Sequence, residues 1–524
     1  MEEQEINRLR KVIGRNTIGD LLRRAARRSP DKLAVSFYDT KLTYRQWNDA
    51  VNALAHGLHD KGVKCGDHVA LIGRNSLDYL SGFLALAKLG AVSVPINPAL
   101  KEQEMAYILS HGDVRHAFFD AQLETIVTKA SEIAGISLEV RLKLNEKGER
   151  SLSGAASTDT SEFWSDIDET TPVQILYTSG TEARPKGAVH THRSLIDQYA
   201  SIIIAGQFSE HDVTLHALPL YHSAQLNAFF GPMLYLSAGH VVVDRPDPAI
   251  LIEEISKNEV TLFFAPPTVW IGILRSPEFS PERLKCLKKA VYGASIMPEE
   301  ILKELNRVLP WVKFYNMYGM TEVAPFATSL PPEQQLIRPR SVGKPGVNVE
   351  MTILRDDDSE ADVGEIGEIA FRTSHAMREY YKAPELTLQA FRNGWYHTGD
   401  IGFIDEEGYL TIVDRKKDMI KTGGENVASR EVEEVIYLHP AVQECAVVGM
   451  PHPKWIEAVV AAVVVRQGQN VKEQEIIDHC KKHLAGFKVP KAVVFVDSLP
   501  KSASGKILKK DIRENLASQG FYFD

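Results

Sequence analysis

Short apolar runs alternate with segments of helical apolar spacing over roughly the first two thirds of the chain. The runs fall at 68–73, 91–96, 174–177, 261–264, 289–292 and 313–315. Most end near glycine or proline and have the length of buried strands. Strands that alternate with helices predict largely parallel sheets. In such sheets ligands bind beyond the carboxyl ends of the strands, so we look there for chemistry.

The pattern changes from about residue 346. Strand-like runs with turn residues between them follow at 349–353, 365–371 and 409–413, which predicts an antiparallel, β-barrel-like subdomain. After the charged run 414–418, helical spacing and apolar strands alternate again in a compact α+β segment. The predicted fold is therefore an α/β large N-terminal domain, with parallel-sheet and antiparallel parts, followed by a small α+β C-terminal domain.

Composition narrows the function. The 524 residues suggest two or more domains. The formal net charge of -9 argues against a nucleic-acid-coating surface, which needs a net basic face, but leaves anionic small ligands open. Four scattered cysteines without a CxxC pair favour reduced thiols in a cytoplasmic protein. The acidic N-terminus is no secretory signal, and the apolar run 458–465 is too short to be a transmembrane segment.

The segment 177–187 reads Tyr-Thr-Ser-Gly-Thr-Glu-Ala-Arg-Pro-Lys-Gly. A strand leading into small hydroxyl residues and glycines can present N–H groups and hydroxyls to a polyphosphate, with Lys186 adding charge. The segment lacks the Gly-Lys-Ser/Thr ending of a P-loop. An ordinary surface turn is an equal alternative on this segment alone.

A second segment, 315–322, again follows a strand. Tyr318 offers a flat ring for a purine, and Thr321 offers a hydroxyl for a phosphate. Glu322 offers the hard oxygen that Mg²⁺ prefers. Taken alone, a Tyr-Gly turn followed by Thr-Glu is more often plain structure.

Three later segments carry one charged candidate each. Asp400 can accept hydrogen bonds from both hydroxyls of a ribose. Arg415 is a fixed cation suited to phosphate or ribose oxygens, and the following Gly423 and Gly424 allow close backbone approach. Lys506 follows a Ser-Gly turn. A turn aspartate, a solvated charge and a surface lysine are the structural alternatives.

Together, in this order, the five segments resemble the motif set of the adenylate-forming superfamily, which contains acyl-CoA synthetases, adenylation domains of peptide synthetases and firefly-type luciferases. The resemblance runs from Thr17 to Lys510. Further matches lie at 42–44, 84–98, 218–222 and 292–295.

The resemblance implies that ATP and a carboxylic acid react to an acyl-adenylate. Thr321, Glu322, Lys506 and His222 would be catalytic, with Glu322 also the Mg²⁺ ligand. Lys506 would bridge the carboxylate and the α-phosphate. The nucleotide would contact Thr178, Ser179, Gly180, Thr181, Lys186, Gly293, Ala294, Ser295, Tyr318, Gly319, Asp400 and Arg415.

A second half-reaction is implied with coenzyme A. The small domain, 417–524, would rotate against domain 1–416 about a hinge at Lys417. The loop with Lys421, Gly423 and Gly424 would then line the pantetheine channel. The phosphate loop departs from the family pattern, since Glu182 and Ala183 replace its last two residues, which leaves the role of these two positions open.

The leading prediction is an ATP-dependent acyl-CoA synthetase for a monocarboxylic acid, with a fatty acid favoured. Aryl-CoA ligase, a ligase loading a separate carrier protein, a luciferase-like oxygenase and a nucleotide-binding regulatory protein are the alternatives. The resemblance leaves a homodimer open. The residues predicted near the acid, apart from His222, are Tyr221, Gln225, Leu226, Phe229, Met320, Ala324 and Pro325, and they are mostly apolar.

Overall fold

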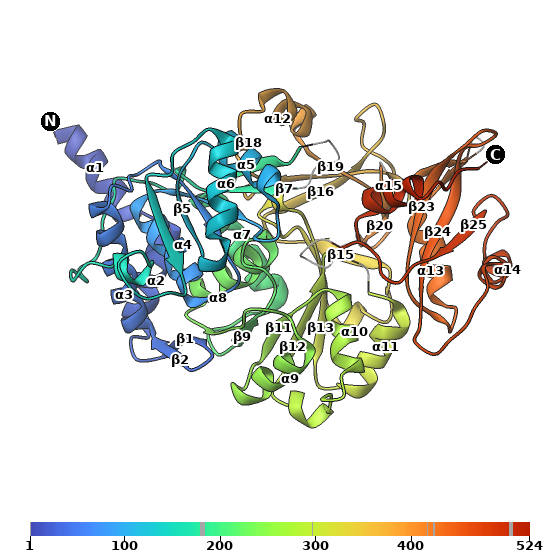
Figure 1. Ribbon diagram of the computed structural model, residues 1–524, viewed down its shortest axis with the longest axis horizontal. Coiled ribbons are helices and arrows are strands. Elements are labelled where there is room, and N and C mark those ends of the chain that lie inside the picture. Colours follow the sequence, from blue (N-terminus) through green and yellow to red (C-terminus); the bar gives the residue numbers. More distant parts are fainter. Residues whose placement is uncertain are drawn as a thin grey trace.

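The computed structural model describes residues 2–178, 184–295, 297–416, 418–422, 425–501 and 507–523 (Figure 1). Their strands form three sheets, of thirteen, seven and five strands. Serine 179 to Ala183, Lys417, Gly423, Gly424 and Lys506 lie outside the described residues.

The seven-stranded sheet has the order β18-β8-β7-β4-β3-β5-β6 and is parallel from β7 to β6. β8 and β18 add to it in antiparallel fashion. Its strands are β3 (His68–Ile72), β4 (Val92–Ile96), β5 (Val114–Asp120), β6 (Val140–Leu144), β7 (Pro172–Thr178), β8 (Lys186–Thr191) and β18 (Glu379–Tyr380).

The thirteen-stranded sheet joins the predicted parallel and antiparallel parts into one surface. β1 and β9 to β13 run parallel, and the antiparallel strands β14 and β15 connect β13 to β20. The strands of the sheet are β1 (Leu33–Phe37), β2 (Thr40–Thr43), β9 (Val213–His216), β10 (Gly239–Val242), β11 (Leu262–Phe264), β12 (Lys289–Gly293), β13 (Lys313–Tyr318), β14 (Thr328–Leu330), β15 (Ser341–Pro345), β16 (Val349–Leu354), β17 (Gly367–Thr373), β19 (Tyr396–Ile404) and β20 (Leu410–Arg415).

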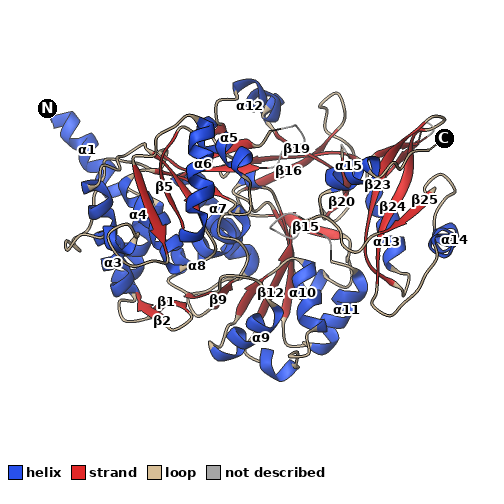
Figure 2. Ribbon diagram, in the orientation of Figure 1, coloured by secondary structure: helices blue, strands red, loops and turns tan. Residues whose placement is uncertain are grey.

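Helices cover these sheets, as Figure 2 shows. Their apolar faces fill continuous cores between helix and sheet, which is what gives these amphipathic segments their stability. The helices of this part are α1 (Glu2–Gly14), α2 (Ile18–Arg28), α3 (Tyr44–Asp60), α4 (Leu77–Leu89), α5 (Glu102–His111), α6 (Glu124–Ala134), α7 (His192–Gly206), α8 (Gly231–Leu236), α9 (Pro248–Lys257), α10 (Pro267–Arg275), α11 (Glu299–Val308) and α12 (Pro384–Ala390). A π-helix, η3 (Ala224–Phe230), precedes α8.

The small domain forms the red end of the chain in Figure 1 and has its own sheet and cores. It contains β21 (Ile420–Thr422), β22 (Glu425–Val427), β23 (Val442–His452), β24 (Ile456–Val465), β25 (Ala492–Phe495), α13 (Ser429–Tyr437), α14 (Glu473–His483) and α15 (Lys509–Ser518). β23 and β24 pair over ten register positions, and this long hairpin is the central element of the small domain's sheet.

The predicted α/β class and the order of large and small parts are confirmed. The clearest addition is β19, where the segment around Asp400 is a strand although its polar residues gave no strand pattern. No helix among the described residues is long and apolar enough to cross a membrane.

Candidate active site

The predicted phosphate loop is the connection of a β-hairpin. β7 and β8 pair antiparallel, and Thr178 lies opposite Lys186 at the last register position before the loop. Lys186 Nζ lies 5.6 Å from the ring centroid of Tyr380, over its face. Residues 179–183 lie outside the described residues, so the hairpin fixes where the loop begins and ends.

Tyr318 at the end of β13 and Arg415 at the end of β20 come together with Asp400 in the middle of β19. Tyr318 Oη donates a hydrogen bond to Asp400 Oδ2 at 2.6 Å. Arg415 Nε lies 3.0 Å from Asp400 Oδ1. Asp400 and Arg415 are also register partners in the antiparallel pair of β19 and β20. The sheet therefore brings Tyr318 to Asp400, 82 positions away in the sequence, and Asp400 to Arg415 on the next strand.

One carboxylate oxygen of Asp400 has no hydrogen-bond partner among the described residues. Its Oδ1 is buried and, among the described residues, makes no directed hydrogen bond, although the Arg415 guanidinium is at ion-pair distance. A buried carboxylate oxygen without a hydrogen-bond donor is costly, so this atom fits a hydroxyl donor such as a ribose.

The charges around Arg415 stabilise its cation. Burial by itself would lower the pKa of Arg415, but the charge of Asp400 and its neighbours outweighs burial and raises that pKa. Burial, with the Asp400 charge beside it, raises the pKa of Tyr318 well above its ordinary value. Tyr318 thus stays a neutral donor while Arg415 stays a cation.

Thr321 is held by two side chains from other elements. Its Oγ1 lies 2.9 Å from Ser223 Oγ. Its carbonyl accepts a hydrogen bond from His190 Nε2 at 2.8 Å, which places the proton of that buried imidazole on Nε2. Burial lowers the pKa of His190 to about 4, so the imidazole is neutral near pH 7. These contacts orient the Thr321 hydroxyl.

Glu322 lies in a short 3₁₀ turn, Thr321–Val323. Its Oε1 accepts a hydrogen bond from Tyr380 Oη at 2.9 Å, and its carbonyl accepts one from the Met377 amide at 2.7 Å. A single fixed carboxylate fits Mg²⁺, which usually takes one or two carboxylates and completes its shell with phosphate and water oxygens. The described residues hold no cluster of three or more His, Cys, Asp or Glu suited to a metal.

Two glycines at the strand ends allow close backbone packing. A Cβ on Gly293 would lie 2.3 Å from the Met317 carbonyl, and one on Gly319 would lie 1.8 Å from the Pro325 carbonyl. Ala294 adopts a left-handed conformation with φ 63°, which is strained for a residue with a Cβ. Ala294 and Ser295 are exposed, so this strained turn ends β12 at the surface where ligands are expected.

The residues predicted near the acid do not form one cluster. Leu226 and Ala324 pack in the core around α2 to α4, and Phe229 packs in another, where its ring stacks on Phe264 at 4.2 Å. Met320 lies at the edge of a third core. Gln225 is fully buried, and its side chain is bonded to protein groups. Tyr221, His222 and Pro325 are partly buried.

The small domain meets the large one through polar contacts near the predicted boundary. Asp414 Oδ2 accepts hydrogen bonds from the backbone N and the Oγ of Ser429, both at 2.6 Å. Arg430 Nη1 donates to the Ile412 carbonyl at 2.5 Å. Lys421 is exposed, and its backbone amide donates a hydrogen bond to Glu457 Oε2 at 2.8 Å, within the small domain.

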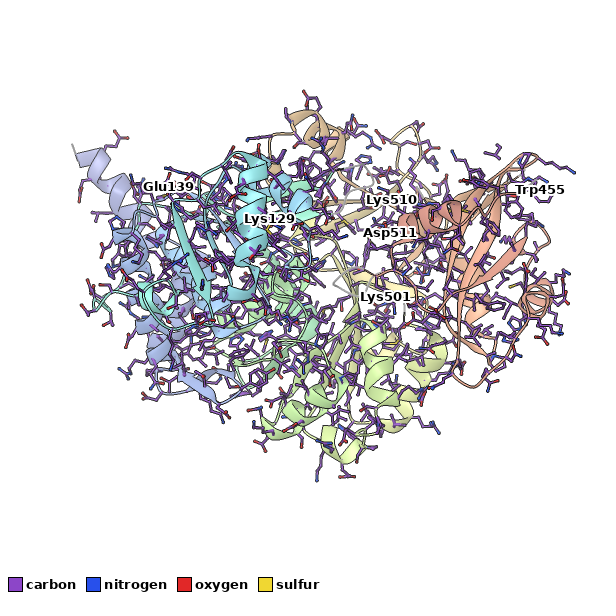
Figure 3. The ribbon with its side chains drawn as sticks, in the orientation of Figure 1. Lys129, Glu139, Trp455, Lys501, Lys510 and Asp511 are labelled. Carbon is purple, nitrogen blue, oxygen red and sulfur yellow. The ribbon has the colours of Figure 1, made fainter. Side chains whose placement is uncertain are left out.

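Lys506 lies outside the described residues, but its neighbours are placed. Lys501 and Ile507 pair in an antiparallel bridge that closes the segment between them. In Figure 3, Lys501 and Lys510 lie on the side of the small domain that faces the large one, whereas Trp455 lies at its far end.

Sequence reasoning missed Ser223, His190 and Tyr380, which hold Thr321 and Glu322. Tyr380 lies 58 positions from Glu322, and Ser223 lies 98 positions from Thr321. Ser223 directly follows His222 and the motif match at 218–222, so the sequence could have indicated it as a site residue. Nothing in the sequence around Tyr380 marks it.

Comparison with known proteins identifies the family. Residues 22–381 match the AMP-binding enzyme family, and residues 431–506 match the AMP-binding enzyme C-terminal domain. The chain is 35% identical over 492 residues to a feruloyl-CoA synthase of Amycolatopsis sp., covering 94% of this chain and 97% of that protein. It is 34% identical over 508 residues to the long-chain-fatty-acid–CoA ligase FadD13 of Mycobacterium tuberculosis, covering 96% and 99%.

Among solved structures, the anthranilate CoA ligase AuaEII in complex with anthranoyl-AMP is 27% identical, with a TM-score of 0.89 over 96% of this chain and 98% of that one. The chain therefore belongs to the AMP-binding enzyme family, within the adenylate-forming superfamily. It is an enzyme of the acyl-CoA synthetase and ligase branch of that family.

Proposed function

We propose that this enzyme activates a monocarboxylic acid with ATP as an acyl-adenylate, releases pyrophosphate, and passes the acyl group to the thiol of coenzyme A. The observation that carries the proposal is the convergence of Tyr318, Asp400 and Arg415 beside the turn that holds Thr321 and Glu322. These residues offer a ring, a carboxylate oxygen that is ion-paired but accepts no hydrogen bond from a described residue, a cation, a hydroxyl and a metal ligand.

The roles follow from the donors and charges. Asp400 Oδ1 would accept from a ribose hydroxyl, and Arg415 would contact nucleotide oxygens. Thr321 would donate to the α-phosphate. Lys186 and residues 178–181 would hold the outer phosphates at the hairpin end. Glu322 would hold Mg²⁺, which supplies charge neutralisation when bound.

Lys506 would act at the moment of bond formation. A carboxylate oxygen of the acid attacks the α-phosphorus, and the bond to the pyrophosphate oxygen breaks. Negative charge that develops on the α-phosphate needs a fixed cation, and Lys506 would supply it. His222 would lie between the acid and the thiol path.

The thiol step requires the small domain. We propose that residues 417–524 rotate about Lys417, so that Lys421, Gly423 and Gly424 replace Lys506 at the site. The polar contacts of Ser429 and Arg430 with the large domain support this proposal, because such contacts exchange with water more readily than a large apolar interface. The thiolate then attacks the acyl carbon, and AMP leaves.

The acid is proposed to be fatty, with an aryl acid as the alternative. The residues predicted near the acid are mostly apolar, and one of them, Phe229, stacks on Phe264. An amino acid fits less well, because its ammonium group needs a buried carboxylate. The relatives named above include both a feruloyl-CoA synthase and a long-chain-fatty-acid–CoA ligase, so the acid panel must contain both aryl and fatty acids.

The experiment is a panel of fatty, aryl and amino acids in pyrophosphate exchange, followed by product analysis with coenzyme A and with a carrier protein. We expect exchange with a fatty acid, and AMP and an acyl-CoA thioester as products. A clear optimum with an amino acid would overturn the acid class, and transfer only to a carrier protein would overturn the acceptor. We also propose a cytoplasmic location, which fits the four free cysteines.

A further inference from the structure

Two buried histidines lie in neighbouring strands of the thirteen-stranded sheet, and the proposed reaction assigns them no role. His216 ends β9 and His240 lies in β10, the neighbouring parallel strand. Their side chains are almost completely buried, and their rings stack at 5.2 Å between centroids with an interplanar angle of 23°. Burying two imidazoles is costly unless their nitrogens find partners.

A chain of hydrogen bonds supplies those partners. Gln225 Nε2 lies 2.8 Å from His216 Nδ1. His216 Nε2 lies 2.9 Å from His240 Nδ1. His240 Nε2 lies 3.5 Å from Tyr44 Oη, the longest link. We call this set, with the two backbone groups at its ends, the buried histidine chain.

Backbone groups at both ends fix the direction of the chain. The Leu218 amide donates to Gln225 Oε1 at 3.2 Å, so the amide nitrogen of Gln225 must face His216. At the other end Tyr44 Oη donates to the Ala238 carbonyl at 2.5 Å. A backbone N–H only donates and a carbonyl only accepts, so one proton arrangement satisfies every link.

That arrangement makes both imidazoles neutral, with the proton on Nε2 and a free lone pair on Nδ1. Protonating His216 or His240 on Nδ1 would set one N–H against another and break a link. Burial lowers the pKa of His216 to about 3 and lowers the pKa of His240 well below 6.5, which agrees with the geometry. The buried histidine chain is therefore uncharged near pH 7, and its hydrogen bonds have one fixed direction.

The buried histidine chain ends at Gln225, in the segment that contacts Thr321. Gln225 lies in the first turn of the π-helix η3, and Ser223 directly precedes that helix. Ser223 Oγ lies 2.9 Å from Thr321 Oγ1. Gln225 lies two positions after Ser223, so movement of Gln225 would be transmitted through this short backbone segment to the Thr321 hydroxyl and to the residues predicted near the acid.

We propose that His216 and His240 are positioning residues that hold η3 in place through Gln225, and so set the fit of the carboxylic acid beside Thr321. The inference rests on the proposed function for its readout. It gives Gln225 a supporting role within the wall of the acid site. The alternative is that the two rings only fill the core, in which case any change of equal volume would act alike.

The test compares His240→Phe, which keeps a ring and removes the links, with His240→Gln, which keeps a donor and an acceptor. Trp47→Phe is the matched control, because Trp47 packs on His240 at 6.1 Å but forms no link of the chain. We expect His240→Phe to raise the KM for the acid about tenfold and to leave the KM for ATP nearly unchanged. His240→Gln should recover most of the loss.

Trp47→Phe should lower the melting temperature without changing the KM for the acid. Equal effects of His240→Phe and Trp47→Phe on that KM, or an unchanged KM in folded His240→Phe, would overturn the inference. If His240→Phe does not fold, Tyr44→Phe breaks only the terminal links and should give the same pattern at smaller size.

Nitrogen-15 NMR of the histidine-labelled wild-type enzyme tests the chain without activity. We expect both imidazoles neutral with the proton on Nε2 at pH 7, assigned with the His216→Gln and His240→Gln variants. A proton on Nδ1 of either ring would overturn the inference. Failure of the proposed function would give a different result: the wild-type enzyme would then show no pyrophosphate exchange with any acid of the panel.

Discussion

The large domain and the small domain contribute to the site in different ways. In the large domain, candidate residues are tied to one another: Tyr318 to Asp400, Asp400 to Arg415, and Glu322 to Tyr380. The small domain meets it through polar contacts such as that of Ser429 with Asp414. The difference supports the proposal that the large domain supplies a fixed nucleotide site and that the small domain rotates to present different residues to it.

The largest effect on the reaction rate is expected from substitution of Lys506 in the small domain. Lys506→Ala should reduce adenylation by about 10²- to 10³-fold, because one fixed donor to developing charge is lost. Formation of thioester from supplied acyl-AMP should persist. Pyrophosphate exchange and single-turnover thioester formation measure the two steps separately.

Lys510→Ala is the matched control, since Lys510 is a neighbouring lysine whose ammonium group lies 3.7 Å from Glu514 on the surface of α15. It should behave as wild type. Near wild-type adenylation in Lys506→Ala would show that Lys506 is not catalytic, and that the small domain supplies no catalytic lysine to this step.

The large domain is tested at its central carboxylate. Asp400→Ala leaves Tyr318 and Arg415 without their shared partner and removes the proposed ribose acceptor. We expect kcat/KM for ATP to fall about 10- to 100-fold, since hydrogen bonds to charged groups are worth this much. Steady-state kinetics with ATP varied gives the value.

Tyr318→Phe is the control for Asp400→Ala, because it removes one hydroxyl and keeps the ring. Its loss should be the smaller of the two. If Asp400→Ala binds ATP as well as wild type, the carboxylate has only a structural role.

A substitution at the proposed hinge is expected to affect the two half-reactions unequally. Lys417→Pro fixes φ at one value, so we expect thioester formation to fall about tenfold while adenylation is affected less. Both half-reactions are measured on one preparation. Equal loss in both would place the pivot elsewhere.

Acid should weaken the large domain before the small one. All buried histidines that the structure describes, including His190 and His192, lie in the large domain. Burial lowers the pKa of His190 to about 4 and that of His192 to about 3. Since the unfolded chain binds protons first, stability is complete above pH ~6.5 and is lost as pH falls towards 4.

The expected loss at pH 5 is of the order of 2 kcal/mol for each such imidazole. Trp455→Phe leaves tryptophans only in the large domain, so melting curves by fluorescence at pH 7 and pH 5 report on that domain. His192→Gln should flatten the pH dependence, whereas the exposed His483→Gln should not. A large domain whose melting point is independent of pH would contradict the prediction.

The strands and the order of the domains were predictable because buried strands are apolar runs, as in β3, β4 and β24. β19 was not, because its residues around Asp400 are polar and serve the site. Motif residues such as Glu322 could be named from the sequence, but their partners could not. The contacts of Thr321 with Ser223 and His190 depend on where three separate elements meet, and local patterns carry no such information.

Gln225 shows the same limit on the acid side. Its position predicted a place near the acid, and the structure brings its amide onto His216, nine positions away, and through it onto His240. Neither histidine belongs to a motif. Pairing of β9 with β10 brings them together, so only the fold reveals the chain.

The central claim is that the enzyme makes an acyl-adenylate, and pyrophosphate exchange into ATP tests it most directly. The account predicts exchange that requires a monocarboxylic acid and Mg²⁺, needs no coenzyme A, and gives AMP once coenzyme A is added. Exchange without acid, or ADP as the product, would contradict it.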